Sequence, residues 1–170
     1  MKHCFIPNQF YLHTHFNYDP ETGIFSRKIK QSNRTIIGKP LLAGAKNKGQ
    51  KRIIIHIQGK VYKAHHLAWV YVYGVWPEEV DHINNDPTDN RISNLRLATR
   101  QQNSYNKKMY RKTESGIKGV TWDKQRKKWF VKINANKKQI PLGRYDDLKD
   151  AERVITKARE QYHGEFANFN

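Results

Sequence analysis

In the last third of the chain, the spacing of the apolar residues changes from that of strands to that of a helix. This change constrains the fold more than any other feature of the sequence. Between residues 120 and 142, apolar and polar residues alternate in three short runs, which is the period of strands with one buried face. Polar turns at residues 123–127 and 135–138 would join these runs antiparallel. From residue 148 to 162 the apolar residues recur at helical spacing, and Gly164 follows as a stop. The pattern predicts a three-stranded antiparallel sheet packed on one helix.

The first half of the chain has a different pattern, of hairpins followed by a helix. Turns at Thr22-Gly23 and at Gln58-Gly59 each separate two short runs with strand character. An apolar helix is expected over residues 65–73. The expected strands are residues 16–18, 24–27, 52–57 and 60–63. The chain as a whole is therefore expected to be α+β.

An acid and a histidine stand together in the run Val-Asp-His-Ile-Asn-Asn-Asp at residues 80–86. Asp81 and Asn103 offer the hard oxygen atoms that Mg²⁺ prefers as ligands. His82 could take a proton from water, because imidazole titrates near neutrality when a second group fixes its ring. Asn94 suits that second role. These residue types indicate phosphodiester hydrolysis assisted by a metal ion.

The local pattern around these residues predicts two strands and a helix. Residues 79–83 and 95–98 have strand character, and the Asn- and Asp-rich segment 84–90 is a loop. Thr99 precedes Gln102 by three residues, the spacing of a capping box that begins a short helix.

The segments 81–86, 89–96 and 98–103 resemble the HNH endonuclease family, in the phage and intron-homing type that has asparagine in place of the last histidine. Segments 18–25 and 64–69 are similar to stretches upstream of the motif in phage members.

This resemblance implies the ββα-metal fold, in which two strands and a helix surround one divalent metal ion. It implies that Asp81 and Asn103 are the metal ligands, that His82 is the general base and that Asn94 orients it. His65 and His66, on the expected helix, are open between packing and a catalytic role.

The charge of the chain indicates a polyanionic partner. The formal net charge is +17 and the pI is about 10.0, which points to nucleic acid or to an acidic membrane. No apolar run approaches the length needed to span a membrane. Residues 107–138 hold twelve Lys or Arg against two acidic residues, and their first part, 107–115, is expected to be a basic linker. A solvated charge run is the alternative for this region.

The segments 115–122, 128–133 and 142–145 resemble the ethylene-response-factor type of DNA-binding domain. That domain is a three-stranded sheet backed by one helix, and it reads the major groove. The expected DNA-binding residues are the linker lysines and the residues on the reading face: Lys107, Lys108, Lys118, Thr121, Lys128, Lys132, Asn134 and Gln139.

The sequence thus predicts a nuclease domain at residues 1–106, a basic linker at 107–115 and a DNA-binding domain at 116–170. The expected activity is that of a DNA endonuclease that uses Mg²⁺, with Mn²⁺ as a substitute, on double-stranded DNA. The alternatives are an inactive DNA-binding protein and a nuclease that acts on RNA. We expect a monomer or homodimer in the cytoplasm of the host cell, with no membrane association, and no feature indicates a protein partner.

Overall fold

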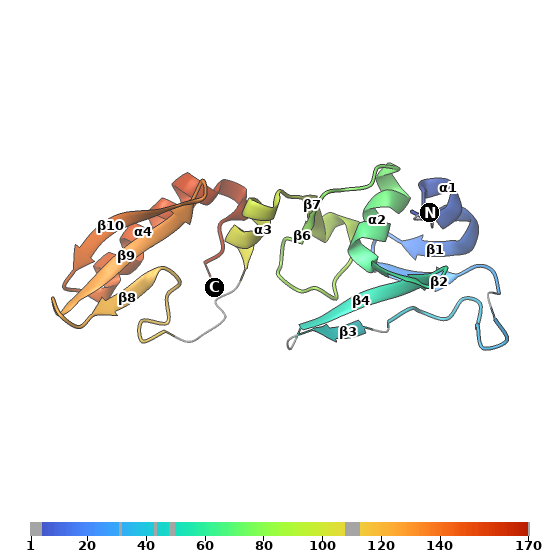
Figure 1. Cartoon of the computed structure of the whole chain (residues 1–170), viewed down its shortest axis with the longest axis horizontal. Coiled ribbons are helices and arrows are strands. Elements are labelled where there is room, and N and C mark those ends of the chain that lie inside the picture. The colour runs from blue at the N-terminus through green and yellow to red at the C-terminus, as the bar shows by residue number, and fades with distance from the viewer. Residues whose placement is uncertain (1–4, 31, 43, 48–49, 108–112, 170) are drawn as a thin grey trace. The chain divides into compact units, whose positions relative to one another are not determined.

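The computed structural model describes residues 5–30, 32–42, 44–47, 50–107 and 113–169. The chain divides into two compact units, Met1–Ala98 and Thr99–Asn170. Both are mixed assemblies of small antiparallel sheets and helices (Figure 1). Among the described residues, no helix has the length and apolar character required to cross a bilayer.

The N-terminal unit contains three small sheets and two α-helices among its described residues. Its elements in chain order are α1 (Gln9–His15), β1 (Phe16–Asp19), β2 (Ile24–Arg27), β3 (Gly44–Asn47), β4 (Gln50–Ile57), β5 (Lys60–Lys63), α2 (Ala64–Tyr73), β6 (Val80–His82), the 3-10 helix η1 (Ile92–Asn94) and β7 (Leu95–Leu97). β1 pairs with β2, β4 lies between β3 and β5, and β6 pairs with β7. The hairpins expected at the two turns are confirmed as β1–β2 and β4–β5.

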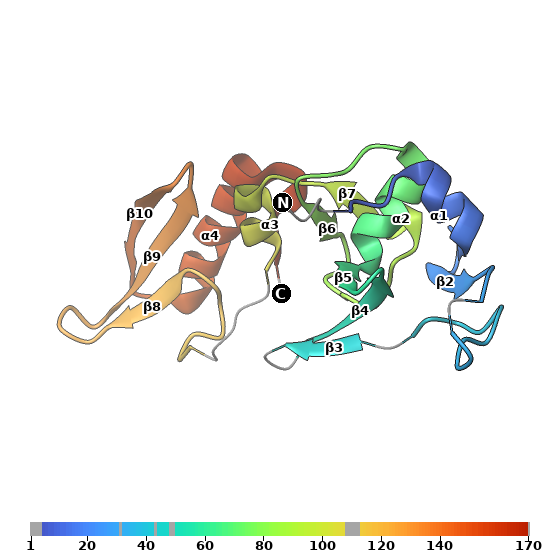
Figure 2. The same cartoon turned by 45° about the vertical axis from the view of Figure 1, so that its right-hand side comes forward.

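The core of this unit lies between α2, α1 and the sheets. α2 buries Leu67, Ala68 and Val70, and α1 packs beside it (Figure 2). α2 ends where Gly74 adopts φ of +73° and donates its N–H to the Val70 carbonyl, a conformation that glycine favours. The sequence analysis did not predict α1, because this helix buries only Leu12 and shows no apolar period. The other large fully buried side chains of this core are Phe16, Phe25, Ile55 and Ile57.

The described residues of the C-terminal unit form one sheet and the helices around it. Its elements are α3 (Arg100–Asn106), β8 (Val120–Asp123), β9 (Lys128–Ala135), β10 (Lys138–Tyr145), α4 (Leu148–His163) and the 3-10 helix η2 (Gly164–Phe166). The strands are antiparallel with β9 in the centre, and α4 packs on one face of this sheet (Figure 1). The buried residues of this core are Val120, Val131, Ile133, Ala151, Ile155 and Ala158.

Helix α3 belongs to the C-terminal unit in this division. The sequence analysis placed the boundary after residue 106, whereas the structure divides the chain between Ala98 and Thr99. The difference arises because Tyr105 and Asn106, which are buried, contact residues of the C-terminal unit. The helix itself is the expected one, with Thr99 as its N-cap in a capping box.

Candidate active site

Strand β6 places a carboxylate and an imidazole side by side in buried positions. Asp81 is 5% exposed and His82 is 9% exposed. The pairing with β7 sets Asp81 opposite Arg96 and His82 opposite Leu95. The Arg96 guanidinium donates to Asp81 Oδ2 through Nε at 3.0 Å and through Nη2 at 2.9 Å. This ion pair fixes the carboxylate and balances its charge away from bulk water.

The imidazole of His82 is held by the side chain of Asn90. The distance from His82 Nε2 to Asn90 Oδ1 is 3.0 Å. Because an amide oxygen accepts hydrogen bonds, the ring hydrogen is assigned to Nε2, and the lone pair of the neutral ring is then on Nδ1. Burial lowers the pKa of His82 below its ordinary value, and the hydrogen bond to Asn90 opposes this shift. The ring is therefore neutral at physiological pH and can accept a proton.

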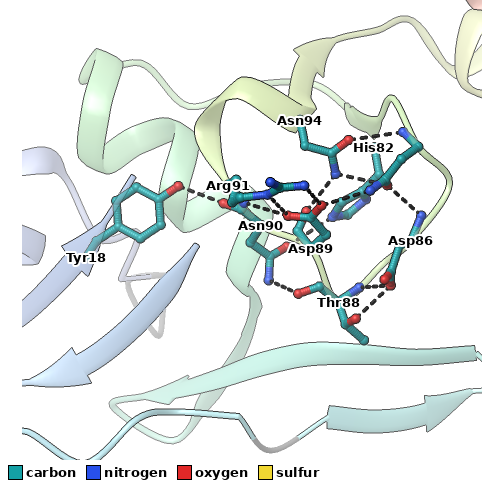
Figure 3. A network of polar contacts seen from close by, with 9 residues as sticks. Tyr18, His82, Asp86, Thr88, Asp89, Asn90, Arg91 and Asn94 are labelled. Carbon is teal, nitrogen blue, oxygen red and sulfur yellow. Dashed lines mark hydrogen bonds and ion pairs between the residues drawn. The ribbon is translucent and has the colours of Figure 1, made fainter. Parts of the chain in front are cut away.

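Asn94 closes the loop between the two strands of the site (Figure 3). Its Oδ1 accepts from the backbone N–H of Asn84 at 3.0 Å. Its Nδ2 donates to Asn84 Oδ1 at 3.0 Å and to the Asp89 carbonyl at 2.9 Å. These bonds join both ends of the loop to a single buried side chain.

In the structure, Asn90 makes the contact with His82 that was expected of Asn94. The sequence analysis gave Asn94 the role of orienting His82, but the bond to His82 Nε2 comes from Asn90. Asn90 is 1% exposed, so its amide has little freedom to turn away. Sequence reasoning missed it because the segment 84–94 contains several asparagines, and only the folded loop distinguishes them.

The first hairpin holds the backbone of this loop. The Tyr18 hydroxyl donates to the Asn90 carbonyl at 2.7 Å (Figure 3). The Ile92 N–H donates to the Pro20 carbonyl at 3.0 Å. Burial raises the pKa of the Tyr18 phenol, which therefore stays protonated as a donor. The turn glycine, Gly23, lies so close that a Cβ there would be 2.4 Å from the backbone of residues 90–91. The hairpin β1–β2 thus positions the residue that holds His82.

We expect Gly23→Ala to destabilise the protein far more than Gly59→Ala. Both glycines close hairpins with nearly equal φ, +71° and +75°, but a Cβ at Gly59 would meet nothing within 4 Å. Gly59→Ala should cost about 1 kcal/mol of unfolding free energy through backbone strain alone. Gly23→Ala should cost about 3 kcal/mol or more, because the loop backbone must also move. Urea unfolding of both variants checks this, and equal costs would contradict the proposed hairpin–loop contact.

Two further histidines lie beside His82, both on α2. The His65 ring centroid is 4.7 Å from that of His82 and 4.8 Å from that of His66. Burial lowers the pKa of His65 well below its ordinary value and lowers the pKa of His66 to about 4. Among the described residues, His65 Nδ1 and His66 Nε2 have no hydrogen-bond partner. The rings of His65 and His66 are therefore neutral, each has a ring nitrogen without a hydrogen-bond partner among the described residues, and His65 packs against the candidate base.

Mild acid is expected to destabilise the N-terminal unit. The folded-state pKa values of His65, His66 and His82 lie below 6.5, so the unfolded chain binds more protons as the pH falls. Their contribution is present above about pH 6.5 and is lost as the pH falls toward about 4. We expect a lower urea midpoint at pH 4.5 than at pH 7, and a smaller difference in His66→Gln. Identical midpoints at the two pH values would contradict the burial of neutral rings.

Asp81 and Asn103 each carry an oxygen atom of the kind that a divalent cation of the magnesium type prefers. Mg²⁺ is commonly bound by one or two carboxylates together with waters and substrate phosphates. Asp81 provides a buried carboxylate, and Asn103, half-buried on α3, provides an amide oxygen. Among the described residues, no three His, Cys, Asp or Glu side chains gather at one point. A site with one carboxylate does not require such a group.

The outer face of the C-terminal sheet carries most of the residues expected to contact DNA. Thr121, Asn134 and Gln139 are exposed, and Lys128 and Lys132 are partly exposed. Lys132 Nζ is 3.5 Å from Gln139 Oε1, and Gln139 Nε2 is 3.4 Å from Asn134 Oδ1. Lys132, Asn134 and Gln139 therefore form a continuous polar row across β9 and β10.

Sequence reasoning missed Arg144, which shares this face. Arg144 lies opposite Phe130 in the register of β10 and β9, and its guanidinium is 4.7 Å from the Phe130 ring centroid. Its Nε donates to Asp123 Oδ2 at 2.9 Å. An arginine held in this way is oriented before any ligand binds. Simple alternation from Ile140 would have placed Arg144 on the apolar face, but the register shift between Pro141 and Gly143 sets it opposite Phe130 instead.

The structure assigns a different position to Lys118. Its ammonium donates to the carbonyls of Tyr105 at 3.0 Å and Lys107 at 2.7 Å, so it binds the end of α3 rather than standing in the polar row. Burial lowers the pKa of Lys118, and the nearby Arg159 adds to this effect. Lys107 is exposed at the C-cap of α3. Lys108, the other expected linker contact, lies outside the described residues.

Comparisons with known proteins match part of this chain to a family. A family model described as HNH endonuclease matches residues 62–105, which include β6, β7 and α3 up to Tyr105. Protein 3.8 of Escherichia phage T7 is 35% identical over 112 residues, or 65% of this chain and 92% of that protein. The solved structure titled "DNA binding and cleavage by the HNH homing endonuclease I-HmuI" is 27% identical with a TM-score of 0.40, over 54% of this chain. The chain spans 51%, about half, of that structure's length.

Proposed function

This chain belongs to the same family as Protein 3.8 of Escherichia phage T7 and contains an HNH endonuclease domain, and we propose that it is a divalent-metal-dependent endonuclease of double-stranded DNA. The observation that carries the proposal is the neutral, buried imidazole of His82, held at Nε2 and adjacent to the buried carboxylate of Asp81. A phage or intron-homing enzyme fits the phage relative.

His82 is the general base of the proposed reaction. With its hydrogen on Nε2 bound to Asn90, it accepts a proton from water on Nδ1, and the water oxygen attacks phosphorus. The amide oxygen of Asn90 then stabilises the imidazolium that forms. His65 excludes water from one side of the His82 ring, because it packs edge-on against that ring and is 4% exposed.

Asp81 and Asn103 are the proposed metal ligands. A bound Mg²⁺ or Mn²⁺ would supply positive charge to the phosphate and to the leaving 3′ oxygen. Arg96 holds Asp81 Oδ2, so it orients the carboxylate for this role. Asn94 keeps the intervening loop closed through its bonds to Asn84 and Asp89.

The C-terminal unit supplies DNA affinity and part of the sequence choice. Its basic residues bind phosphates without regard to sequence, and the outer sheet face contacts base edges, as in the ethylene-response-factor type of domain that it resembles. The row of Lys132, Asn134 and Gln139 together with Arg144 is the proposed reading surface. One catalytic set is present in each chain, so a double-strand break would need two chains or two successive nicks.

Incubation of supercoiled plasmid with the protein tests the proposed function. Nicked or linear plasmid is expected with Mg²⁺ or Mn²⁺ and intact plasmid with EDTA. Binding of duplex DNA without cutting under any of these metals would favour an inactive DNA-binding protein. Preferential cleavage of RNA over duplex DNA would favour an RNA-directed nuclease.

A further inference from the structure

The helix that carries Asn103 is held in place by the C-terminal unit. α3 has seven residues, and isolated helices shorter than about 12 residues are marginal in water. The capping box of Thr99 and Gln102 satisfies its first turn locally. Its last turn has no glycine stop, and its carbonyls are bound by side chains that lie much later in the sequence.

Side chains of Lys118 and Asn168 bind the carbonyl end of α3. Lys118 Nζ donates to the carbonyls of Tyr105 and Lys107, and Asn168 Nδ2 donates to the carbonyl of Asn106. A positive charge at a helix C-terminus also interacts favourably with the helix dipole. Asn106 is 3% exposed and Asn168 is 5% exposed, so their hydrogen bond is shielded from water. Arg159 donates to the Lys118 carbonyl and thereby fixes the backbone that presents the ammonium.

The side chain of Tyr105 anchors the same turn. Its ring stacks on His163 with centroids 3.8 Å apart and planes 11° apart. Its hydroxyl accepts from the backbone N–H of Asn136 at 3.1 Å. His163 Nε2 lies 2.9 Å from the Asn134 carbonyl, to which it donates. Tyr105 therefore contacts both the end of α4 and the turn between β9 and β10.

We propose that the C-terminal unit, besides binding DNA, positions Asn103 for the nuclease through Tyr105, Lys118 and Asn168. Asn103 lies on α3 two residues before Tyr105, so its position depends on the bonds at the end of that helix. This inference rests on the proposed function, in which Asn103 is a metal ligand. Lys118 and Tyr105 act through α3, so they are positioning residues rather than catalytic ones.

The test compares two lysines of the C-terminal unit in the full-length protein. Lys118→Met removes the ammonium that binds α3, whereas Lys149→Met makes the same chemical change at an exposed position on α4. In Lys118→Met, amide hydrogen exchange of α3 should lose roughly tenfold to a hundredfold protection, as expected from lost bonds to a charged donor. Cleavage at saturating DNA and Mg²⁺ should fall with it. Lys149→Met should leave the exchange of α3 unchanged.

Tyr105→Phe provides a milder second variant in case Lys118→Met does not fold. It keeps the ring that stacks on His163 and removes only the hydroxyl, which accepts from the Asn136 N–H and also bonds to the Gln101 side chain. We expect a smaller loss of α3 protection and a correspondingly smaller loss of cleavage, with duplex affinity in EDTA close to that of the natural protein.

The outcomes separate this inference from the proposed function. Unchanged α3 protection in both Lys118→Met and Tyr105→Phe would overturn the inference, and so would lost protection with full cleavage. Reduced duplex affinity with unchanged α3 protection would make Lys118 a DNA contact instead. Failure of the natural protein to cut any nucleic acid with any divalent metal would overturn the proposed function, while the exchange data would still decide whether α3 is held.

Discussion

Replacement of His82 with alanine should lower DNA cleavage about 10²- to 10⁴-fold, the usual effect of removing a general base. The affinity for duplex DNA should change little, because His82 is 9% exposed and contributes no fixed charge at neutral pH. Single-turnover cleavage with excess enzyme measures the loss, and a binding titration in EDTA measures the affinity.

His56→Ala is the matched control for this experiment. His56 is an exposed histidine on β4, whereas the ring of His82 is buried. Cleavage within a few-fold of the natural protein is expected for the control. If His82→Ala also cut at nearly normal rate, His82 would not be the base, and the neighbouring His65 would be the next candidate because its ring packs against that of His82.

Replacement of Asp81 with asparagine should abolish metal-dependent cleavage. The substitution keeps the shape of the side chain but removes the one carboxylate among the proposed ligands, and Mg²⁺ depends strongly on such a charge. It also leaves the Arg96 guanidinium, whose side chain is 15% exposed, without its ion-pair partner. We therefore expect a loss of stability as well, of up to about 3 kcal/mol.

A double variant separates these two effects. Asp81→Asn combined with Arg96→Met removes both charges of the pair, and it should recover much of the stability without recovering cleavage. Normal cleavage by Asp81→Asn would contradict the ligand assignment. Asp86 and Asp89 would then be the remaining carboxylates of the loop, although hydrogen bonds from Thr88 and Arg91 already lower their pKa values and occupy their oxygens.

The strands around the site were predictable because their signals are local. The strand character of residues 79–83 and 95–98 predicted β6 and β7, and the spacing of Thr99 and Gln102 predicted the start of α3. The C-terminal sheet was predictable for the same reason, because apolar residues at every second position indicated its buried face. Each of these predictions depends on neighbours within a few residues in the chain.

The partners of the site residues were not predictable in this way. Asn84, Asn90 and Asn94 have the same side chain and lie within eleven residues, yet one holds an imidazole and another closes a loop. The choice depends on Tyr18 and Pro20, which fix the loop backbone from more than seventy residues away in the sequence. Nothing in the local sequence encodes that contact.

The sequence by itself determined the chemical groups available to this protein, which are an acid, a base, amide oxygens and a large excess of basic residues. It also determined the strands and helices that carry them, because the spacing of apolar residues within each element is a local signal. Tertiary structure decided which of these groups contact one another. It gave His82 a hydrogen bond to Asn90, and it placed the ammonium of Lys118 on the carbonyl end of α3. The physical reason is that a buried polar group must find a hydrogen-bond partner, and the available partner is set by the fold rather than by the sequence neighbours.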